Sequence, residues 1–234
     1  GYNTLNEVYM GIYNDADVGY QGKQSIYTDD ISGFIETFPV KFRSCDFRDT
    51  VNIAWVADND GDPTAGMFNY ESPTSATGIR IVRTPADTLD VSFNWWISAS
   101  GQLDFGPREK SGVGRLKEPY RDFGTGGTGT PEGDPNKYYQ LRNQEFDYDQ
   151  VFAAKIQPSD TLWQLPNQDL APDYAVGYDT RFLLSFGPFD IRPGEVLPLS
   201  FAYLGGENFH RDPNNLDNLP DYPELFYRGI SFDN

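Results

Sequence analysis

The sequence predicts an all-β fold, an antiparallel, jelly-roll-like β-sandwich with long loops and little helix. Glycine (23 residues) and proline (17 residues) interrupt the 234-residue chain so often that a long helical period finds no room. Short segments instead alternate apolar and polar side chains, which is typical of half-buried strands. Their number suits two packed sheets in a single domain that spans residues 1–234.

The expected strands follow one another along the chain, and each is bounded by Asp, Asn, Gly or Pro. They cover residues 7–13, 31–38, 51–57, 78–83, 91–97, 151–156, 181–186 and 197–204. Alternation places Val51, Ile53 and Trp55 on one face of the third strand, and Phe93 and Trp95 on one face of the fifth.

Proline marks a boundary in the last expected strand. Pro198 has no backbone N–H to give to a sheet. The strand is therefore expected at the edge of a sheet, or to begin just after the proline.

Two segments do not follow the strand pattern. Residues 101–135 contain a glycine- and threonine-rich run from Gly124 to Pro131 that has little to bury. We expect a solvated excursion from the domain, with a binding loop as the alternative. Residues 208–234 are expected to form a loop-like tail.

The charge excludes some classes of partner. Asp and Glu number 35 against 18 Lys and Arg, which gives a net charge of −17. Nucleic acids and anionic membrane surfaces attract basic proteins, so neither is an expected partner. No segment approaches the roughly 20 apolar residues of a membrane span, and the first residues lack the pattern of a signal peptide.

The single cysteine and single histidine limit the available chemistry. Cys45 cannot form a disulfide within the chain, and Cys45 and His210 together cannot build a zinc site. Neither residue lies in a recognisable nucleophile motif, and His210 is expected to contact solvent or a backbone carbonyl. No catalytic residue is assigned, and the chain is expected not to be an enzyme.

An acidic loop follows the third expected strand. Asp58, Asp60 and Asp62 alternate around a turn and could direct carboxylate oxygens at one Ca²⁺ ion. The loop is not an EF-hand, because Pro63 replaces the sixth-position glycine and Asn69 replaces the final glutamate. The alternative interpretation is that Asp, Asn and Gly are simply good turn residues.

A second acidic cluster is expected at the first two strands. Asp15 and Asp17 follow the first strand, and Asp29 and Asp30 precede the second. If these strands paired as a hairpin, four carboxylates would meet at one loop, and a cation would relieve their repulsion. An open loop with carboxylates pointing apart in water is the alternative.

Two features suggest carbohydrate chemistry. Asp147 and Asp149 lie on one face of an extended segment, at a spacing that glycosidase carboxylates also use, although acidic pairs are common in this chain. Trp96 would stack on a sugar if it were exposed, whereas burial would make it ordinary packing.

Several phrases resemble a known group of proteins. The run from Asp179 to Glu195, with the segments from Val8 to Gly19 and Ala57 to Asp62, is similar to β-rich domains of large secreted or surface-attached bacterial multidomain proteins, often with a C-terminal sorting domain. The resemblance implies a secreted or cell-surface location and neighbouring domains or other surface proteins as partners.

These observations favour a non-catalytic structural or adhesion module whose aspartate loops bind calcium. One alternative is a carbohydrate-binding or glycoside hydrolase-like domain that recognises glycans. Another is the subunit of an extracellular filament that self-assembles through a sheet edge.

Overall fold

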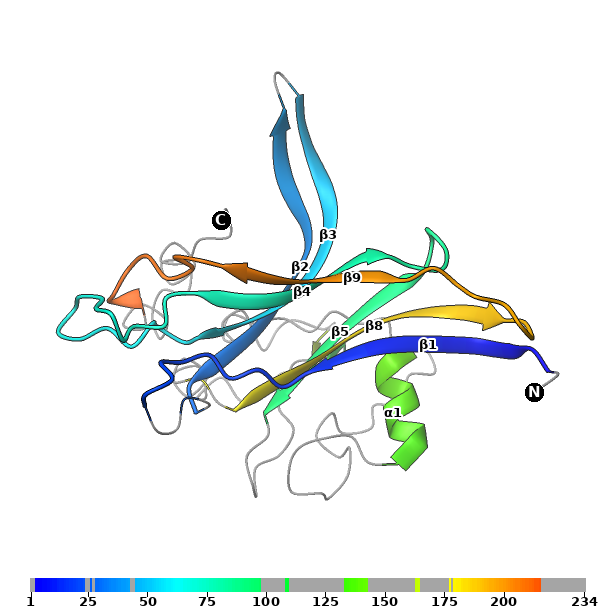
Figure 1. Ribbon diagram of the computed structural model, residues 1–234, viewed down its shortest axis with the longest axis horizontal. Helices are drawn as coiled ribbons and strands as arrows, with labels where there is room; N and C mark the ends of the chain where they lie inside the picture. The colour runs from blue at the N-terminus through cyan, green and yellow to red at the C-terminus, as the bar shows by residue number, and fades with distance from the viewer. Residues whose placement is uncertain are drawn as a thin grey trace.

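The computed structural model describes residues 3–23, 26, 28–42, 45–97, 108–109, 133–142, 163–164, 177 and 179–215. Within these residues most of the chain is β-strand, arranged in two main antiparallel sheets with a single α-helix (Figure 1). The all-β prediction is therefore confirmed. The strand expected at residues 151–156 lies outside the described residues.

The two main sheets contain three and four strands. The smaller has the order β1 (Leu5–Asn14), β8 (Thr180–Ile191), β5 (Asp90–Ile97). The larger has the order β2 (Asp30–Phe42), β3 (Cys45–Asp58), β4 (Ala76–Arg83), β9 (Ser200–Gly206). A short separate pair joins β6 (Arg108–Glu109) to β7 (Trp163–Gln164).

One hydrophobic core lies between the two main sheets. Its buried side chains come from both, including Val56 and Ile79 of the larger sheet and Phe93 and Leu184 of the smaller. Phe34 of β2 stacks on Phe93 of β5 with ring centroids 5.3 Å apart.

In β5 the alternating pattern identified the core face correctly. In β3 it did not, because the core residues are Ala54 and Val56, whereas Trp55 lies on the other face against Phe209. Both faces of β3 are covered near its end, so alternation could not distinguish them there.

The pairing of the first strands differs from the hairpin considered above. β1 pairs with β8, and β2 pairs with β3. Only two residues separate β2 from β3, so a tight hairpin forms there, whereas residues 15–29 lie between β1 and β2. The hairpin considered for the first two strands therefore does not form.

The β2–β3 hairpin extends beyond its sheet. β3 pairs with β4 only through residues 53–57, while its pairing with β2 continues to Cys45. Figure 1 shows the outer part of this hairpin projecting from the body as a two-stranded arm. Phe47 on the arm is half exposed.

The last strand behaves as Pro198 predicts. β9 begins at Ser200, after the proline, and it forms an edge of the four-stranded sheet. Both expected consequences of the missing N–H are therefore observed.

Helix α1 (Gly133–Arg142) was not expected, and it begins inside the region assigned to the glycine-rich excursion. It packs on the three-stranded sheet, where Gly11 leaves room for Leu141 and Ser185 donates a hydrogen bond to the Leu141 carbonyl. Of the helical residues that the structure describes, none belongs to a helix long and apolar enough to cross a bilayer.

Replacing Phe93 with alanine should cost about 3–5 kcal/mol of unfolding free energy, because its ring is fully buried and the surrounding core cannot close the cavity. Phe47→Ala on the arm is the control and should cost far less. Urea denaturation of the two variants and the parent measures the difference. Equal losses for both variants would contradict a core centred on Phe93.

Candidate metal centre

The register of β2 and β3 brings two acidic segments together. Asp30, the first residue of β2, lies directly opposite Asp58, the last residue of β3. The segments pair beyond the sheet as well, because the Asn59 N–H donates to the Asp29 carbonyl at 2.9 Å. Asp29 and Asp30 therefore adjoin the loop that carries Asp60 and Asp62.

Three carboxylates converge at this point. Asp29, Asp58 and Asp62 each direct one oxygen into a group in which all the oxygens lie within 4.8 Å of one another. Oxygen ligands that each lie 2.3–2.6 Å from a calcium ion can be at most about 5.2 Å apart. The spacing therefore fits a single shared cation.

Backbone hydrogen bonds fix the shape of the acidic loop. Asp58 Oδ1 accepts the N–H groups of Asp60 and Gly61 at 3.1 and 2.6 Å, and Asp60 Oδ1 accepts the N–H of Asp62 at 2.6 Å. Gly61 and Asp62 adopt positive φ values of 79° and 47°, which suit glycine and aspartate at a tight turn. The Asp60 carboxylate thus supports the loop, and Asp62 is turned toward Asp58.

The three carboxylates are crowded and partly withdrawn from water. Burial, reinforced by Asp29, raises the pKa of Asp58 to about 8, against the lowering effect of its two N–H donors. Burial and then Asp62 and Asp60 raise the pKa of Asp29 to about 6. Asp62 also pairs with the ammonium of Lys23, at 2.8 Å. With every group ionised, the three carboxylates and Lys23 leave two net negative charges.

Asp30 lies beside this group without joining it. Its carboxylate accepts the Val18 N–H with both oxygens, at 3.2 and 3.3 Å. The side chain is fully buried, and burial raises its pKa to about 9. Asp30 therefore adds a second buried acid next to Asp58.

His210 lies against the end of β3, where it contacts a backbone carbonyl, one of the two contacts expected from the sequence. Its ring Nε2 is hydrogen-bonded to the carbonyl of Asp58, and the backbone N–H of His210 donates to the Thr74 carbonyl. The side chain is buried, and burial lowers its pKa to about 4. A neutral imidazole that donates from Nε2 therefore holds the end of β3 in place.

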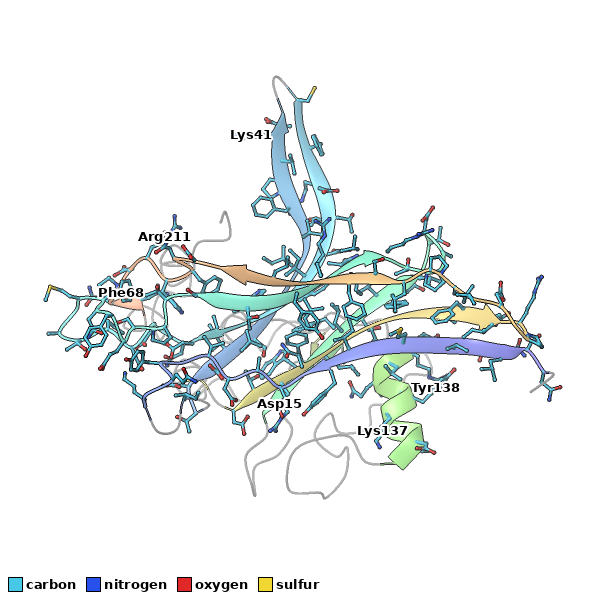
Figure 2. All side chains as sticks on the ribbon, in the orientation of Figure 1. Asp15, Lys41, Phe68, Lys137, Tyr138 and Arg211 are labelled. Carbon is cyan, nitrogen blue, oxygen red and sulfur yellow. The ribbon has the colours of Figure 1, made fainter. Side chains whose placement is uncertain are left out.

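Asp15 and Asp17 form a different group from the one expected. They meet Asp179, just before β8, with one oxygen from each residue within 4.8 Å of the others. Arg181 binds two of the three, with nitrogen–oxygen distances of 2.6 Å to Asp15 and 3.5 Å to Asp179. Figure 2 shows Asp15 near the beginning of β8. The guanidinium of Arg181 therefore already supplies a positive charge to this second group.

Asp179 and Lys23 were missed by the sequence analysis. Asp179 directly precedes a strand, as Asp29 does, so its position was a usable signal. Lys23 lies in an irregular segment without any pattern. Asp147, Asp149 and the side chain of Trp96 lie outside the described residues, and their assignments stay predictions.

In a buffer without divalent cations, unfolding free energy should fall as the pH rises from 6.5 to 8. Folded Asp58 has a pKa of about 8 against an ordinary value of 3.8, so here the folded state holds a proton that the unfolded chain has released. Asp30 acts in the same direction. His210 opposes the slope only near pH 6.5, where the unfolded chain still binds part of a proton at this residue and the folded chain binds none. Each carboxyl contributes up to about 1.4 kcal/mol per pH unit. Urea midpoints at both pH values measure the slope.

Asp58→Asn should make this pH dependence shallower, because an amide keeps the hydrogen-bond acceptor but does not titrate. Asp46→Asn, at an exposed position on the arm, is the matched control and should leave the slope unchanged. A stability that is flat or rises across this range in the parent chain would show that Asp30 and Asp58 are ionised without penalty.

Comparisons with known proteins do not identify the chain. No family model, curated protein or solved structure matches it. The resemblance to bacterial surface proteins therefore stays a prediction from sequence, and any function is inferred from the geometry described above.

Proposed function

We propose that the chain is a non-catalytic structural module of a secreted or surface-attached bacterial protein, stabilised by a calcium ion held by Asp29, Asp58 and Asp62. In this proposal the two main sheets form a jelly-roll-like β-sandwich, which the shared core between them supports. The module serves adhesion, assembly or the presentation of neighbouring domains.

The observation that carries the proposal is the convergence of the Asp29, Asp58 and Asp62 carboxylates. Lys23 pairs with Asp62, which leaves two net negative charges when every group is ionised. Like charges this close, at a site where burial has already raised two pKa values, destabilise the fold unless something neutralises them. A divalent cation supplies the missing charge and also replaces the water that burial removes.

The donor atoms favour calcium over other metals. All three side chains offer carboxylate oxygen, which is the ligand of hard cations, whereas zinc sites use histidine or cysteine. His210 binds the Asp58 carbonyl through Nε2, so this ring nitrogen is engaged outside the carboxylate group. The loop is irregular, and Ca²⁺ accepts irregular coordination more readily than Mg²⁺ does.

The position of the site explains why its role would be structural. The ligands join the beginning of β2 to the loop between β3 and β4, and Asp58 carries two backbone hydrogen bonds on the same side chain. A cation there clamps segments that support the ends of two strands. Extracellular calcium modules work at 10⁻⁴–10⁻³ M, which is consistent with a site of few protein ligands outside the cell.

Calcium should raise the melting temperature of the chelator-treated protein at pH 7.5. At a concentration 100-fold above the dissociation constant, binding to the folded state adds about 2.7 kcal/mol. For a chain of this size that corresponds to a rise of about 5–10 °C. Differential scanning calorimetry with a calcium series, and with magnesium at the same concentrations, measures the shift.

Asp62→Asn should abolish most of this rise, because it removes one ligand charge at a side chain that is 33% exposed, and an exposed side chain is replaced with less disturbance of the fold than buried Asp58. Asp46→Asn again serves as the control and should keep the full rise. The proposal fails if exhaustive chelation leaves the melting temperature unchanged and isothermal titration shows no heat of calcium binding.

A further inference from the structure

The two facing sheets differ by one strand, and the difference falls on one side. At one side β2 lies against β5 and β8, where Phe34 stacks on Phe93 and Ser32 meets Thr180 at 3.0 Å. Counting across from there, the fourth strand of the larger sheet, β9, has no described strand opposite it. The smaller sheet ends at β1, which among the described strands pairs with β8 alone.

The core face of β9 is exposed as a result. Phe201 pairs with Ile81 and Tyr203 pairs with Ile79, and directly opposed residues in an antiparallel pair share a face. Ile79 and Ile81 are buried at 1% and 8% exposure, whereas Tyr203 is 72% and Phe201 38% exposed. Two adjacent aromatic rings thus point to the core side of the sheet, with no described strand lying over them and with Tyr203 the more exposed of the two.

An apolar pocket lies beside the segment that leads into β9. Its volume is about 340 Å³, and it opens between β1, β8 and the segment that leads into β9. The side chains that line it include Val8, Met10, Phe186, Phe189, Leu197 and Leu199. In Figure 1, β9 and β1 cross the view one above the other, with β4, β5 and β8 between them.

We propose that β1 and β9 form an acceptor for one extended strand of a second polypeptide. The strand pairs with the unpartnered edge of β1 along residues 8–12, covers Phe201 and Tyr203, and fills the pocket with an apolar side chain. This docking function goes beyond the structural role proposed above and does not require the cation.

The vacancy is one strand wide, and this determines the kind of occupant. The larger sheet extends past β1 by β9 alone. If a second copy paired its β1 with this β1, its β9 would collide with the larger sheet of this copy. Two copies with a charge of −17 each would also repel one another. A single segment of another chain meets neither obstacle.

The surroundings also specify the partner's side chains. Every second residue should be apolar, because one face of the strand meets the pocket and the two aromatic rings. The remaining residues should be basic or neutral, since the acceptor chain is strongly acidic and carries Glu7 and Glu195 close to the pocket residues Val8 and Leu197. A segment of about seven residues would match the length of β9.

The test uses a fluorescent peptide of about ten residues in which every second residue is valine and the others are lysine or threonine. Fluorescence anisotropy should show saturable binding to the full chain. Phe201→Ser combined with Tyr203→Ser should weaken binding about tenfold or more. Val82→Ser is the matched control, because Val82 is an exposed apolar residue of β4 that does not line the pocket, and it should leave binding unchanged.

Two further peptides separate strand pairing from adsorption. A peptide with the same composition but the valines in one block should bind far more weakly, and so should an N-methylated version that cannot pair with β1. Equal binding of the three peptides would overturn the proposal. Asp62→Asn should retain full peptide binding, so failure of the calcium site and failure of this proposal remain distinguishable.

A strand fused to the chain tests the same pairing without depending on the affinity of a free peptide. The same sequence placed before β1 through an Asn-Gly turn forms a hairpin with it and should raise the melting temperature by several degrees. Serine at every valine position should remove the gain, as should the Phe201→Ser and Tyr203→Ser pair. No gain together with no peptide binding would overturn the proposal. A stable dimer of the unmodified chain that excludes the peptide, seen by analytical ultracentrifugation, would also overturn it.

Discussion

The pairing of Asp30 with Asp58 is the constraint on which this molecule depends. The same register that buries Val56 and Phe34 in the core also places two carboxyl groups opposite each other at the buried end of a strand pair. Shifting the register by one residue would free the acids but turn the apolar side chains toward solvent. Formation of the core therefore brings the acidic groups together, and nearby groups have to offset their unfavourable free energy.

Several groups offset this unfavourable free energy, and each acts on a different part of the acidic cluster. Backbone N–H groups bind Asp58 and Asp30, and Lys23 binds Asp62. Neutral His210 holds the carbonyl of Asp58 without adding charge at neutral pH. The negative charge that these groups leave uncompensated can be neutralised by protons, which the raised pKa values favour, or by a divalent cation. Protons leave as the pH rises and a cation does not, so the two differ mainly in how they respond to solution conditions.

The sequence predicted local features well and long-range pairing poorly, for a physical reason. Alternation identified the core face of β5, and Pro198 correctly marked the start and edge position of β9, because each depends on a few neighbouring residues. Alternation failed for β3, because both faces of that strand are covered near its end. The partner of β1 is β8, far along the chain, and nothing near β1 encodes that choice. His210 and Asp179 are also far in sequence from the aspartates that they meet, so their positions in these sites were not predicted. Helix α1 was missed because its stability comes from packing on the sheet around Gly11 rather than from its own pattern.

The two proposed functions occupy opposite ends of the same sheets, and this separation matters physically. Gly61 of the acidic loop contacts Phe68, which Figure 2 labels at one end of the molecule, while the apolar pocket includes Pro85 of the loop between β4 and β5, at the other end. An unpaired strand edge beside exposed aromatic rings lowers local stability and invites fraying. Cross-linking the far ends of β2 and β3 by a cation would restrain the larger sheet without occupying the acceptor. The acidic surface, unfavourable for self-association, would in turn keep the open edge available to a basic strand.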